Sequence, residues 1–572
     1  MAWVLGTALV GIVLFDCYLA QSRTVPVGSD GASQALQAWD LLHGSPLLHG
    51  WWVTDVSFYT TELPQYALIE LARGLTADVI HVAGAMTYTL LVLAAAFLAR
   101  GRATGSEGLT RALLAAGIML APQLGPGTQT LVLSPDHTGT SIPILLVFLL
   151  IDRTGQAADR APAGRYVPVL VWLCLAWTAV ADAMTIVVAV IPIALVCTIR
   201  LVNGLAVRRE PFADHRREAY LAAAAVLAVP AELAATALIR ANAGWQVNGL
   251  RTALASAGQL AGNARLTGEG LLELFGANVF GAAPGLGTAL AVIHLVGLAV
   301  AVVGVVTAAR RILRRDTRAT QATRDMRATQ STRDTYGTLI NSVLFTGIVI
   351  DLAAYLAGVQ AVNALSTREI APVLPFAAVL AGRCLGGKLL TGKPPTGESP
   401  GRHAAPGPRL AAAGPQLAAS RRALRYGLCA VLALYTAGLG YAAAQPPAAP
   451  QYADLAGWLR AHHLTAGFGG YHQANIVTLQ TGGAVTLRPV TADSGGRIVA
   501  YTWNANADWY NPAAHTATFL VLTAQGTPGS SGLTTARAIA TFGKPARRYQ
   551  YKTYLILVWP QRVNLLSGLP GR

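Results

Sequence analysis

Charged residues are scarce in this sequence of 572 residues, because Asp, Glu, Lys and Arg together make up only 12% of it. A soluble domain carries about 25% of such residues. Hydrophobic residues make up 53%, and the mean hydropathy is +0.45. This composition excludes an ordinary soluble globular protein and predicts a polytopic α-helical membrane protein.

Cysteine is also rare. All five cysteines lie in or beside apolar runs, and none forms a closely spaced pair. They are Cys17, Cys174, Cys197, Cys384 and Cys429. This pattern indicates neither a disulfide framework nor a thiolate metal site.

Eleven apolar segments predict about 11 transmembrane helices. They lie near residues 3–21, 81–99, 110–122, 140–151, 166–181, 183–199, 219–239, 287–309, 338–357, 370–382 and 427–443. Several are shorter than the roughly 20 residues of a perpendicular span, and 140–151 and 370–382 are the weakest. The first segment lacks the basic start and the small-residue cleavage site of a secretory signal, so we expect it to remain as a span.

The net charge of +16 follows the predicted topology. If the first segment runs from the cytoplasm outward, the cytoplasmic loops contain 27 Lys or Arg residues, and the exterior loops before residue 444 contain six. This asymmetry obeys the positive-inside rule. It places the N-terminus in the cytoplasm of a multi-pass protein. It also explains the excess of basic over acidic residues without a nucleic-acid partner.

Two cytoplasmic loops, 310–335 and 383–426, are basic and resemble spacers. Residues 318–325 recur at 327–334 as a nine-residue repeat without an apolar face, and residues 391–420 are rich in Pro, Gly and Ala. Such compositions are typical of flexible linkers.

Residues 445–572 differ from the transmembrane domain at 1–444. A Pro-rich hinge leads into an expected helix at 452–464. Alternating patterns predict strands at Ala484–Arg488, Ile498–Trp503, Thr518–Leu522 and Tyr549–Trp559, with a helix at Thr534–Phe542. The topology makes this an extracytoplasmic α/β domain.

The first exterior loop, residues 22–80, predicts two short amphipathic helices on the membrane surface. Ser29 suits the N-cap of the first helix, and Gly44 suits its end. The second helix is expected to begin at Pro64 and to end near Gly74. An aromatic turn around the Trp51-Trp52 pair would separate them and hold two acids, Asp30 and Asp55, between them.

Other unusual polar residues fall on the same predicted exterior side. They are Asp30, Asp55 and Glu62 of the first loop, Asp136 and His137, Asp182, and the neighbours Arg368 and Glu369. Ionisable groups at the edge of a bilayer are unfavourable unless they face a watery cavity. One exterior cleft that collects them is therefore the working hypothesis.

Each candidate also has a structural alternative. Asp30 and Glu62 suit the first turn of a helix, where acids interact favourably with the helix dipole. The other acids and His137 suit turns. Arg368 suits the membrane boundary, where it would pair with Glu369 or with lipid headgroups.

The layout resembles the GT-C superfamily of integral membrane glycosyltransferases, and bacterial mannosyl- and arabinosyltransferase-like members are the most similar. The similarity rests on the acidic first loop, the many spans and the exterior domain. Ser366–Pro375 is similar to an Arg, aromatic and proline pattern of that group, although Glu369 and Ile370 stand where an aromatic is expected. Tyr471–Asn475 resembles part of the exterior domain.

The resemblance implies transfer of a sugar, with inversion, from a polyprenyl-phosphate donor to a cell-envelope glycan or protein. The reaction would take place on the outer face of a bacterial-type plasma membrane, with the lipid bilayer as a further partner. Asp30 would be the general base, and Asp55 a second carboxylate for the acceptor. Arg368 would bind the donor phosphate.

The remaining candidate residues would bind substrate under the same resemblance. They are Glu62, Asp136, His137 and Asp182, and His137 would also suit phosphate binding or proton transfer. If the enzyme uses a divalent metal ion, Mg²⁺ or Mn²⁺, Asp30 and Asp55 are its expected ligands.

Two other functions stay open. A transporter or flippase would show broken helices in two related halves, but the membrane part has no convincing internal repeat. A non-catalytic membrane protein would keep the layout without the chemistry, and would present its exterior domain to partners in the cell envelope.

Overall fold

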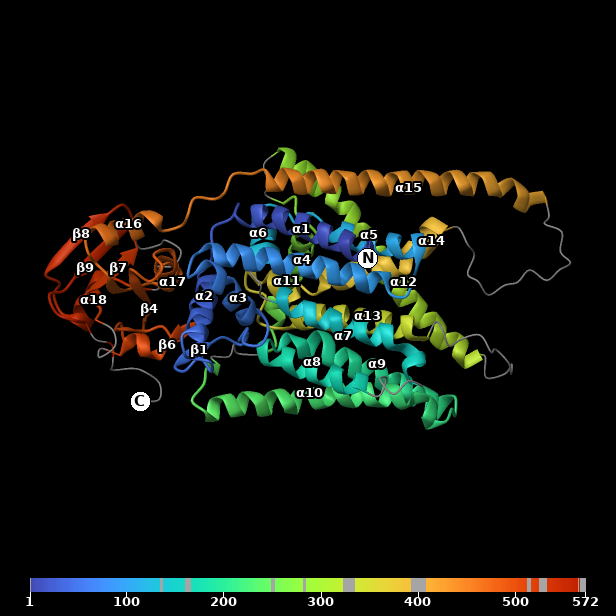
Figure 1. The fold of residues 1–572 in the computed structure, drawn as a ribbon, viewed down its shortest axis with the longest axis horizontal. Helices are drawn as coiled ribbons and strands as arrows, with labels where there is room; N and C mark the ends of the chain where they lie inside the picture. Colours follow the sequence, from blue (N-terminus) through green and yellow to red (C-terminus); the bar gives the residue numbers. More distant parts are fainter. Residues whose placement is uncertain are drawn as a thin grey trace.

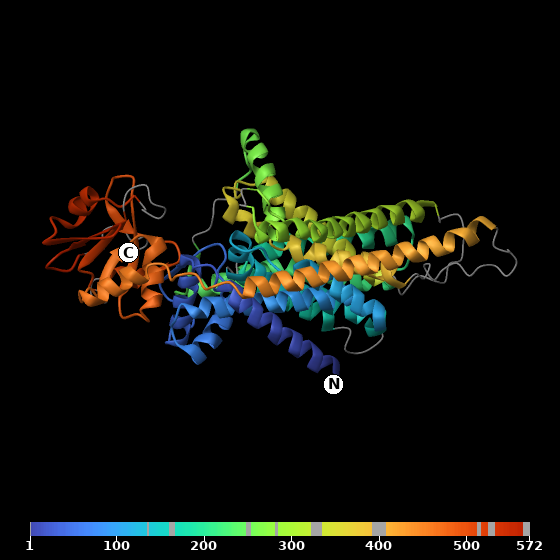
Figure 2. The ribbon, with the colours of Figure 1, turned by 90° about the horizontal axis from the view of Figure 1, so that it is seen from above.

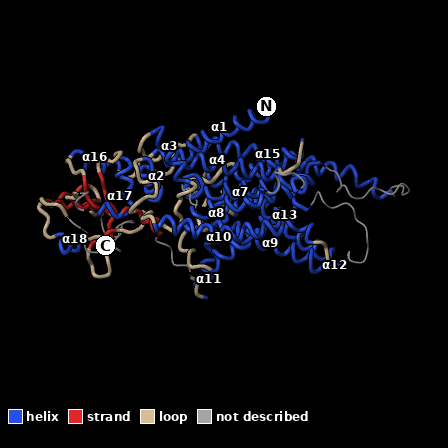
Figure 3. Tube along the Cα trace, turned by 60° about the horizontal axis from the view of Figure 1, so that its bottom comes forward, coloured by secondary structure: helices blue, strands red, loops and turns tan. Residues whose placement is uncertain are grey.

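The computed structural model describes residues 2–133, 137–159, 166–247, 253–280, 284–321, 335–391, 408–511, 516–523, 532–563 and 565. It has two parts, a helix bundle and a strand-containing domain, which lie end to end (Figures 1 and 2). The strands gather at one end of the molecule, and the rest is largely helical (Figure 3).

The long bundle helices fall on the apolar segments of the sequence. They are α1 (Ala2–Ser22), α4 (Asp78–Arg100), α5 (Gly105–Met119), α7 (Thr138–Asp159), α8 (Val167–Ala181), α9 (Ile191–Val202), α10 (Arg216–Ala241), α12 (Leu286–Gln321), α13 (Thr335–Ala357), α14 (Val373–Thr391) and α15 (Pro408–Ala443). This confirms the predicted polytopic α-helical fold class.

Shorter elements join these helices. They are α6 (Pro126–Thr128), α11 (Ala257–Leu274), the π-helices η1 (Gln129–Leu133), η3 (Ile186–Val190) and η4 (Asn203–Val207), and the 3-10 helices η5 (Phe212–His215) and η7 (Ala364–Ile370). Two of them, η1 and η7, lead into α7 and α14 through sharp bends.

The predicted number of 11 spans is not confirmed. In the described part of the chain, seven helices are long and apolar enough to cross a membrane, or up to nine if each bent pair is one span. The weak segments 140–151 and 370–382 belong to these bent pairs, α7 with η1 and α14 with η7. Segments 110–122 and 166–181 correspond to α5 and α8, which have only 15 residues each.

The predicted linkers are partly helical. Residues 408–420 form the start of α15, because this stretch is rich in alanine, the strongest helix former. Residues 318–321 end α12. The rest of the repeat, 322–334, and residues 392–407 lie outside the described residues.

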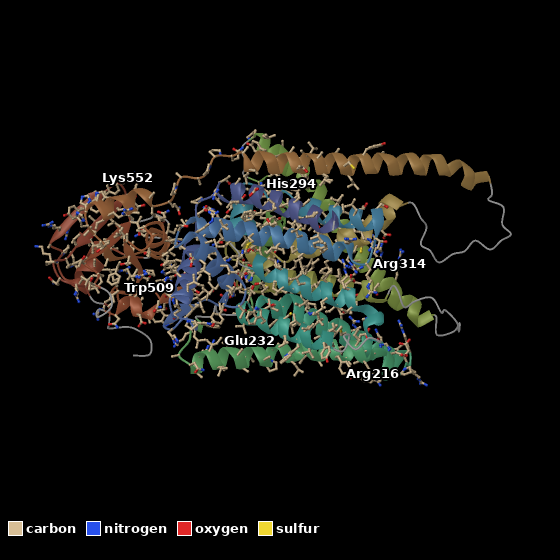
Figure 4. All side chains as sticks on the ribbon, in the orientation of Figure 1. Arg216, Glu232, His294, Arg314, Trp509 and Lys552 are labelled. Atoms are coloured by element: carbon tan, nitrogen blue, oxygen red, sulfur yellow. The ribbon has the colours of Figure 1, made fainter. Side chains whose placement is uncertain are left out.

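Basic residues gather at the end of the bundle away from the strand domain, where Figure 4 labels Arg216 and Arg314. In the same region, Arg383 of α14 pairs with Asp152 of α7 at 2.8 Å. Loops that the charge pattern places on one side of the membrane therefore lie at one end of the molecule.

The first loop forms α2 (Ser29–Leu42), β1 (Trp51–Val53) and α3 (Glu62–Arg73), between the bundle and the strand domain (Figure 1). Both predicted helices are present, but three details differ. α3 begins at Glu62 and not at Pro64. Gly28, whose backbone is extended, is the N-cap of α2 in place of Ser29, and the Ser29 hydroxyl donates to the His472 carbonyl at 2.8 Å. α2 is largely buried under the strand domain, whereas α3 exposes Leu68 and Leu71, as a surface helix would.

The strand domain contains one six-stranded sheet of order β5-β4-β3-β7-β9-β8. Its strands are β3 (Ala466–Gly469), β4 (Thr486–Ala492), β5 (Ile498–Ala500), β7 (Phe519–Thr523), β8 (Arg547–Tyr551) and β9 (Tyr554–Val558). Its helices are α16 (Ala453–Ala461), α17 (Tyr471–Gln480), α18 (Thr535–Phe542) and the 3-10 helix η8 (Ala507–Tyr510). β3 runs parallel to β4 and β7, and the other pairs are antiparallel.

The expected strand at Tyr549–Trp559 is a hairpin, β8 and β9, which turns at Lys552-Thr553. Lys552 has a φ of 50°, the left-handed conformation that tight hairpin turns use. β3 and α17 are two elements of this domain that were not predicted from the sequence.

A second, three-stranded sheet joins the two parts of the molecule. Its order is β2-β1-β6, with β2 at Gln246–Val247 and β6 at Ala505–Asn506. Trp52 pairs with Gln246 in parallel, and Trp51 pairs with Asn506 in antiparallel register. The first loop is thereby fixed to both the bundle and the strand domain.

A candidate active site between the helix bundle and the strand domain

Asp30 lies in the first turn of α2, where the backbone N–H groups and the helix dipole favour an anion. The opposite side of α2 buries Ala32, Ala35 and Leu36 in the core of the junction. This packing fixes the helix, and it leaves the Asp30 side chain 41% exposed. The carboxylate is therefore held in place and is still accessible.

Two groups from distant parts of the chain meet the two oxygens of Asp30. The Tyr471 hydroxyl of α17 donates a hydrogen bond to Oδ1. Arg368 Nη1 lies 3.6 Å from Oδ2, and the Arg368 side chain is 35% exposed. The structure thus brings together two predicted site residues, Asp30 and Arg368, that are separated by most of the bundle sequence.

Arg368 and Glu369 are neighbours in η7, the short helix before α14. The Asn363 side chain caps η7 by accepting hydrogen bonds from the backbone N–H groups of Leu365 and Ser366. Arg368 Nε lies 3.8 Å from Glu369 Oε1. Arg368 therefore stands between two carboxylates, those of Asp30 and Glu369.

His137 connects Glu369 to Asp182. Its Nε2 lies 3.1 Å from Glu369 Oε2, and its Nδ1 lies 2.7 Å from Asp182 Oδ2. The imidazole is only 4% exposed. Since ionised carboxylates only accept hydrogen bonds, both ring nitrogens must donate, and a doubly protonated ring satisfies both contacts.

The charge on His137 has a clear physical origin. Burial disfavours the charged ring, but the carboxylates of Asp182 and Glu369 outweigh it and raise the pKa of His137 well above its usual value. Burial likewise opposes the charge on Asp182, but His137, Thr140 and the Met184 N–H lower the pKa of Asp182 below its usual value. The Thr140 hydroxyl and the Met184 N–H each donate to Asp182, at 2.7 and 2.8 Å.

Asp55 lies next to this group, just after β1. Its neighbour Val56 forms a β-bridge with Asp182, and the Ser57 N–H donates to the Ala181 carbonyl at 2.8 Å. Burial raises the pKa of Asp55, and His137 partly opposes this effect. The predicted acids Asp55 and Asp182 are therefore neighbours, as the single-cleft hypothesis requires.

Glu62 begins α3 and is buried against α7. It accepts a hydrogen bond from the Thr61 hydroxyl, and a Cβ at Gly139 would overlap its carboxylate. The side chain is 1% exposed, so Glu62 is buried beside Gly139, close in sequence to His137. Asp136 lies outside the described residues.

Two residues of this region were not predicted as site residues. Tyr471 was noted only as part of a segment that resembles the exterior domain of the GT-C superfamily. No local pattern in the sequence indicates that it meets Asp30. Asp351 is buried in the apolar helix α13 and interacts electrostatically with His137, Glu369 and Asp182. An acid inside an apolar helix is itself a functional signal, and it could have drawn attention to Asp351.

The residues do not form a recognisable metal site in this arrangement. Among the described residues, no group of three or more His, Cys, Asp or Glu side chains is placed to hold a metal ion. Asp30 instead meets a phenol and a guanidinium, both hydrogen-bond donors. The metal use expected from the sequence stays a prediction, and no chemical step below depends on it.

Neither protein-family models nor curated proteins match this sequence. Solved structures do. The chain is similar to ArnT from Cupriavidus metallidurans bound to undecaprenyl phosphate, with 14% identity, a TM-score of 0.50, and coverage of 97% of this chain and 98% of that chain. It also aligns with the Archaeoglobus fulgidus oligosaccharyltransferase tethered with an acceptor peptide, with 11% identity, a TM-score of 0.45, and coverage of 91% and 69%. The similarity to ArnT spans both parts of the molecule and establishes the fold.

Proposed function

We propose that this chain, which has the fold of the GT-C glycosyltransferases, transfers a sugar from a polyprenyl-phosphate donor to an acceptor of the cell envelope. The proposal rests mainly on the juxtaposition of Asp30 and Arg368 at an accessible place in the junction. A base and a cation side by side are the two groups that such a transfer needs.

The proposed reaction assigns one role to each group. Asp30 Oδ2 takes the proton of the acceptor hydroxyl as the acceptor oxygen bonds to the anomeric carbon of the sugar. The bond from that carbon to the phosphate oxygen breaks, and its electron pair leaves with the polyprenyl phosphate. Arg368 stabilises the charge on the departing phosphate, because a guanidinium offers a planar fork to phosphate oxygens.

The loose contact between Asp30 and Arg368 suits this division of roles. A distance of 3.6 Å is longer than a good hydrogen bond, so a bound phosphate would not have to break a strong hydrogen bond between Asp30 and Arg368. Glu369 holds Arg368 from the other side, and His137 and Asp182 support Glu369. This row of alternating charges would fix Arg368 beside Asp30 before substrate arrives.

A lipid-linked donor is supported by the similarity to ArnT, whose structure contains bound undecaprenyl phosphate. We extend that ligand class to this chain because the fold is shared along almost its whole length. The positive-inside pattern supports an exterior site, since the strand domain lies opposite the basic end of the bundle (Figure 4). The acceptor is proposed to be a cell-envelope glycan or protein.

The other predicted site residues have proposed roles around this pair. Asp55 would orient the acceptor, because its partly exposed carboxylate lies beside the His137 group. Asp182 and His137 would act indirectly through Glu369. If a divalent metal ion takes part, Asp30 and Asp55 remain the proposed ligands.

The test is sugar transfer by membranes that contain the full chain, with radiolabelled polyprenyl-phosphate mannose and polyprenyl-phosphate arabinose as donors. We expect transfer from one donor by the wild type, and at least a hundredfold loss in Asp30→Asn at equal protein level. Asp214→Asn, an exposed acid at the basic end of the bundle, is the matched control and should retain transfer.

Each unfavourable outcome has a separate meaning. Equal transfer by the wild type and Asp30→Asn would show that Asp30 is not the base. No transfer from either donor by the wild type would contradict the proposed donors, and would favour a non-catalytic role.

A further inference from the structure

We infer that the strand domain supplies a positioning residue to the active site: the Tyr471 hydroxyl holds the Asp30 carboxylate in its reactive orientation. This inference rests on the proposed role of Asp30 as the base. It adds a residue from the strand domain to a site otherwise built from the bundle.

The contact between Tyr471 and Asp30 belongs to an organised network. Tyr471 begins α17 and is only 7% exposed. Asn504 Nδ2 donates to the Tyr471 oxygen at 3.4 Å, and the Tyr501 ring lies 4.9 Å from the Tyr471 ring. The phenol is therefore fixed from two sides within its own domain.

Other contacts hold the strand domain on α2 around this point. The Ser29 hydroxyl donates to the His472 carbonyl at 2.8 Å, and the Ser33 hydroxyl donates to the Asn504 carbonyl at 2.9 Å. Ser29 and Ser33 lie one helical turn apart on α2 and flank Asp30. The approach of Tyr471 to Asp30 is thus accompanied by two neighbouring contacts between α2 and the strand domain.

Next to these contacts, two tryptophans anchor the junction. Trp51 of β1 and Trp509 of η8 pack edge to face at 4.9 Å, and Figure 4 shows Trp509 on the side of the strand domain next to α2. The Arg488 guanidinium covers the Trp509 ring at 4.2 Å, and Trp51 Nε1 donates to Asp40 at 2.8 Å. Aromatic contacts of this kind stabilise a fixed interface.

The chemistry explains why a phenol suits this position. Burial, together with the nearby Asp30 charge, raises the pKa of Tyr471 well above its usual value, so the hydroxyl stays protonated and donates to the carboxylate. It occupies Oδ1 and leaves Oδ2 on the side of Arg368. One oxygen of the base is thereby anchored, and the other is directed toward the donor phosphate.

The test compares single substitutions in the full chain in membranes. Tyr471→Phe removes only the hydroxyl, and we expect kcat to fall about tenfold to a hundredfold while the donor KM changes less than twofold. Ser29→Ala removes another hydrogen bond between the same two elements and should lower kcat less than twofold. Tyr549→Phe, on β8 at the outer side of the strand domain, is the control for the chemical change.

A second measurement does not depend on activity. A water-soluble carbodiimide modifies accessible carboxylates, and mass spectrometry of the full chain measures modification of Asp30. Tyr471→Phe uncovers Oδ1, so we expect Asp30 to be modified severalfold faster in this variant than in the wild type, Ser29→Ala or Tyr549→Phe.

The outcomes separate this inference from the proposed function. Equal kcat and equal Asp30 modification in Tyr471→Phe and the wild type would overturn the inference. Equal losses of kcat in Ser29→Ala and Tyr471→Phe would show that domain docking matters, not the hydroxyl, and would also overturn it. If the wild type transfers no sugar, the proposed function fails, and the modification rate alone decides whether Tyr471 holds Asp30.

Discussion

His137 is the residue with the most unusual surroundings in the site. Four acids surround it: Asp182 and Glu369 contact its two ring nitrogens, and Asp55 and Asp351 lie close enough to interact electrostatically. Its backbone has a φ of 58°, a left-handed conformation that non-glycine residues rarely adopt. Such strained backbone is maintained only where surrounding contacts favour it.

These contacts predict a pH-dependent effect of His137→Gln. Glutamine keeps a polar side chain but not the charge. We therefore expect the free energy of unfolding to fall by about 3–5 kcal/mol, the usual effect of breaking a buried ion pair. Because the folded pKa of His137 is raised, its contribution is complete below the unfolded pKa of about 6.5, and it is lost as the pH rises through the folded pKa. The thermal unfolding midpoints of His137→Gln and the wild type in detergent, measured from pH 6 to pH 10, should therefore converge at alkaline pH.

A matched variant tests the cause of this effect. The unfolding midpoint of Tyr549→Phe, a change far from the charged group, should follow that of the wild type at a constant difference across the same pH range. A constant difference between His137→Gln and the wild type would mean that packing, not charge, accounts for the loss.

At the scale of elements, α14 organises the bundle. It contacts α4, α5, α12 and α13, and a run of its residues from Leu374 to Ala381 is almost fully buried. η7, which carries Arg368 and Glu369, leads into it at a bend of 49°. The position of Arg368, just before this helix, therefore depends on how firmly α14 is held in the bundle.

The middle of α14 is held by Arg383. Its guanidinium donates to Asp152 of α7, to Asn341 of α13 and to the Leu98 carbonyl of α4, each at 2.8 Å. Arg383 and Asp152 are 5% and 3% exposed. One side chain thus joins α14 to three other helices.

We expect Arg383→Met to lower the free energy of unfolding by about 3–5 kcal/mol, because it leaves a buried carboxylate without its cation. The double variant Arg383→Met with Asp152→Asn should recover part of this loss, since it removes the unpaired charge as well. Denaturant unfolding in detergent would measure both. A double variant that is less stable than Arg383→Met would contradict the explanation.

At the scale of the whole molecule, the predicted topology assigns opposite sides of the membrane to the two ends. Arg216 is exposed at the basic end, and Arg548 is exposed on β8 of the strand domain. Each can be changed to cysteine in a chain whose two exposed cysteines, Cys174 and Cys429, are replaced by serine.

Labelling with a membrane-impermeant thiol reagent then shows on which side of the membrane each cysteine lies. Arg548→Cys should be labelled in intact cells, and Arg216→Cys only after the cells are lysed. The opposite pattern would reverse the orientation and would move the proposed site to the cytoplasmic face.

The sequence predicted the helical part of the fold well, because hydropathy and charge act locally. α2 and α3 also followed from their apolar periodicity. The three-stranded sheet could not be predicted, since β1, β2 and β6 have two or three residues each and form only by pairing across distant segments. The span count was uncertain for a similar reason, because tertiary contacts support the bent pairs.

The site was predicted in part. Most of its acids, His137 and Arg368 stood out as polar residues beside apolar segments. Their contacts with one another could not be predicted, because no spacing in the sequence indicates that Arg368 meets Asp30 or that His137 lies between Asp182 and Glu369. Tyr471 was missed because its role depends on how the strand domain docks on α2.

The pairing of β1 with β6 also has a consequence for biosynthesis. Trp51 leaves the ribosome long before its partner Asn506, because the helices of the bundle are made between them. Until then, the first loop lacks the strand and the aromatic side chains that complete its core. Synthesis that stops before β6 therefore yields a membrane-inserted chain with an unfinished first loop, so that the proposed reaction centre assembles only after β6 has been made.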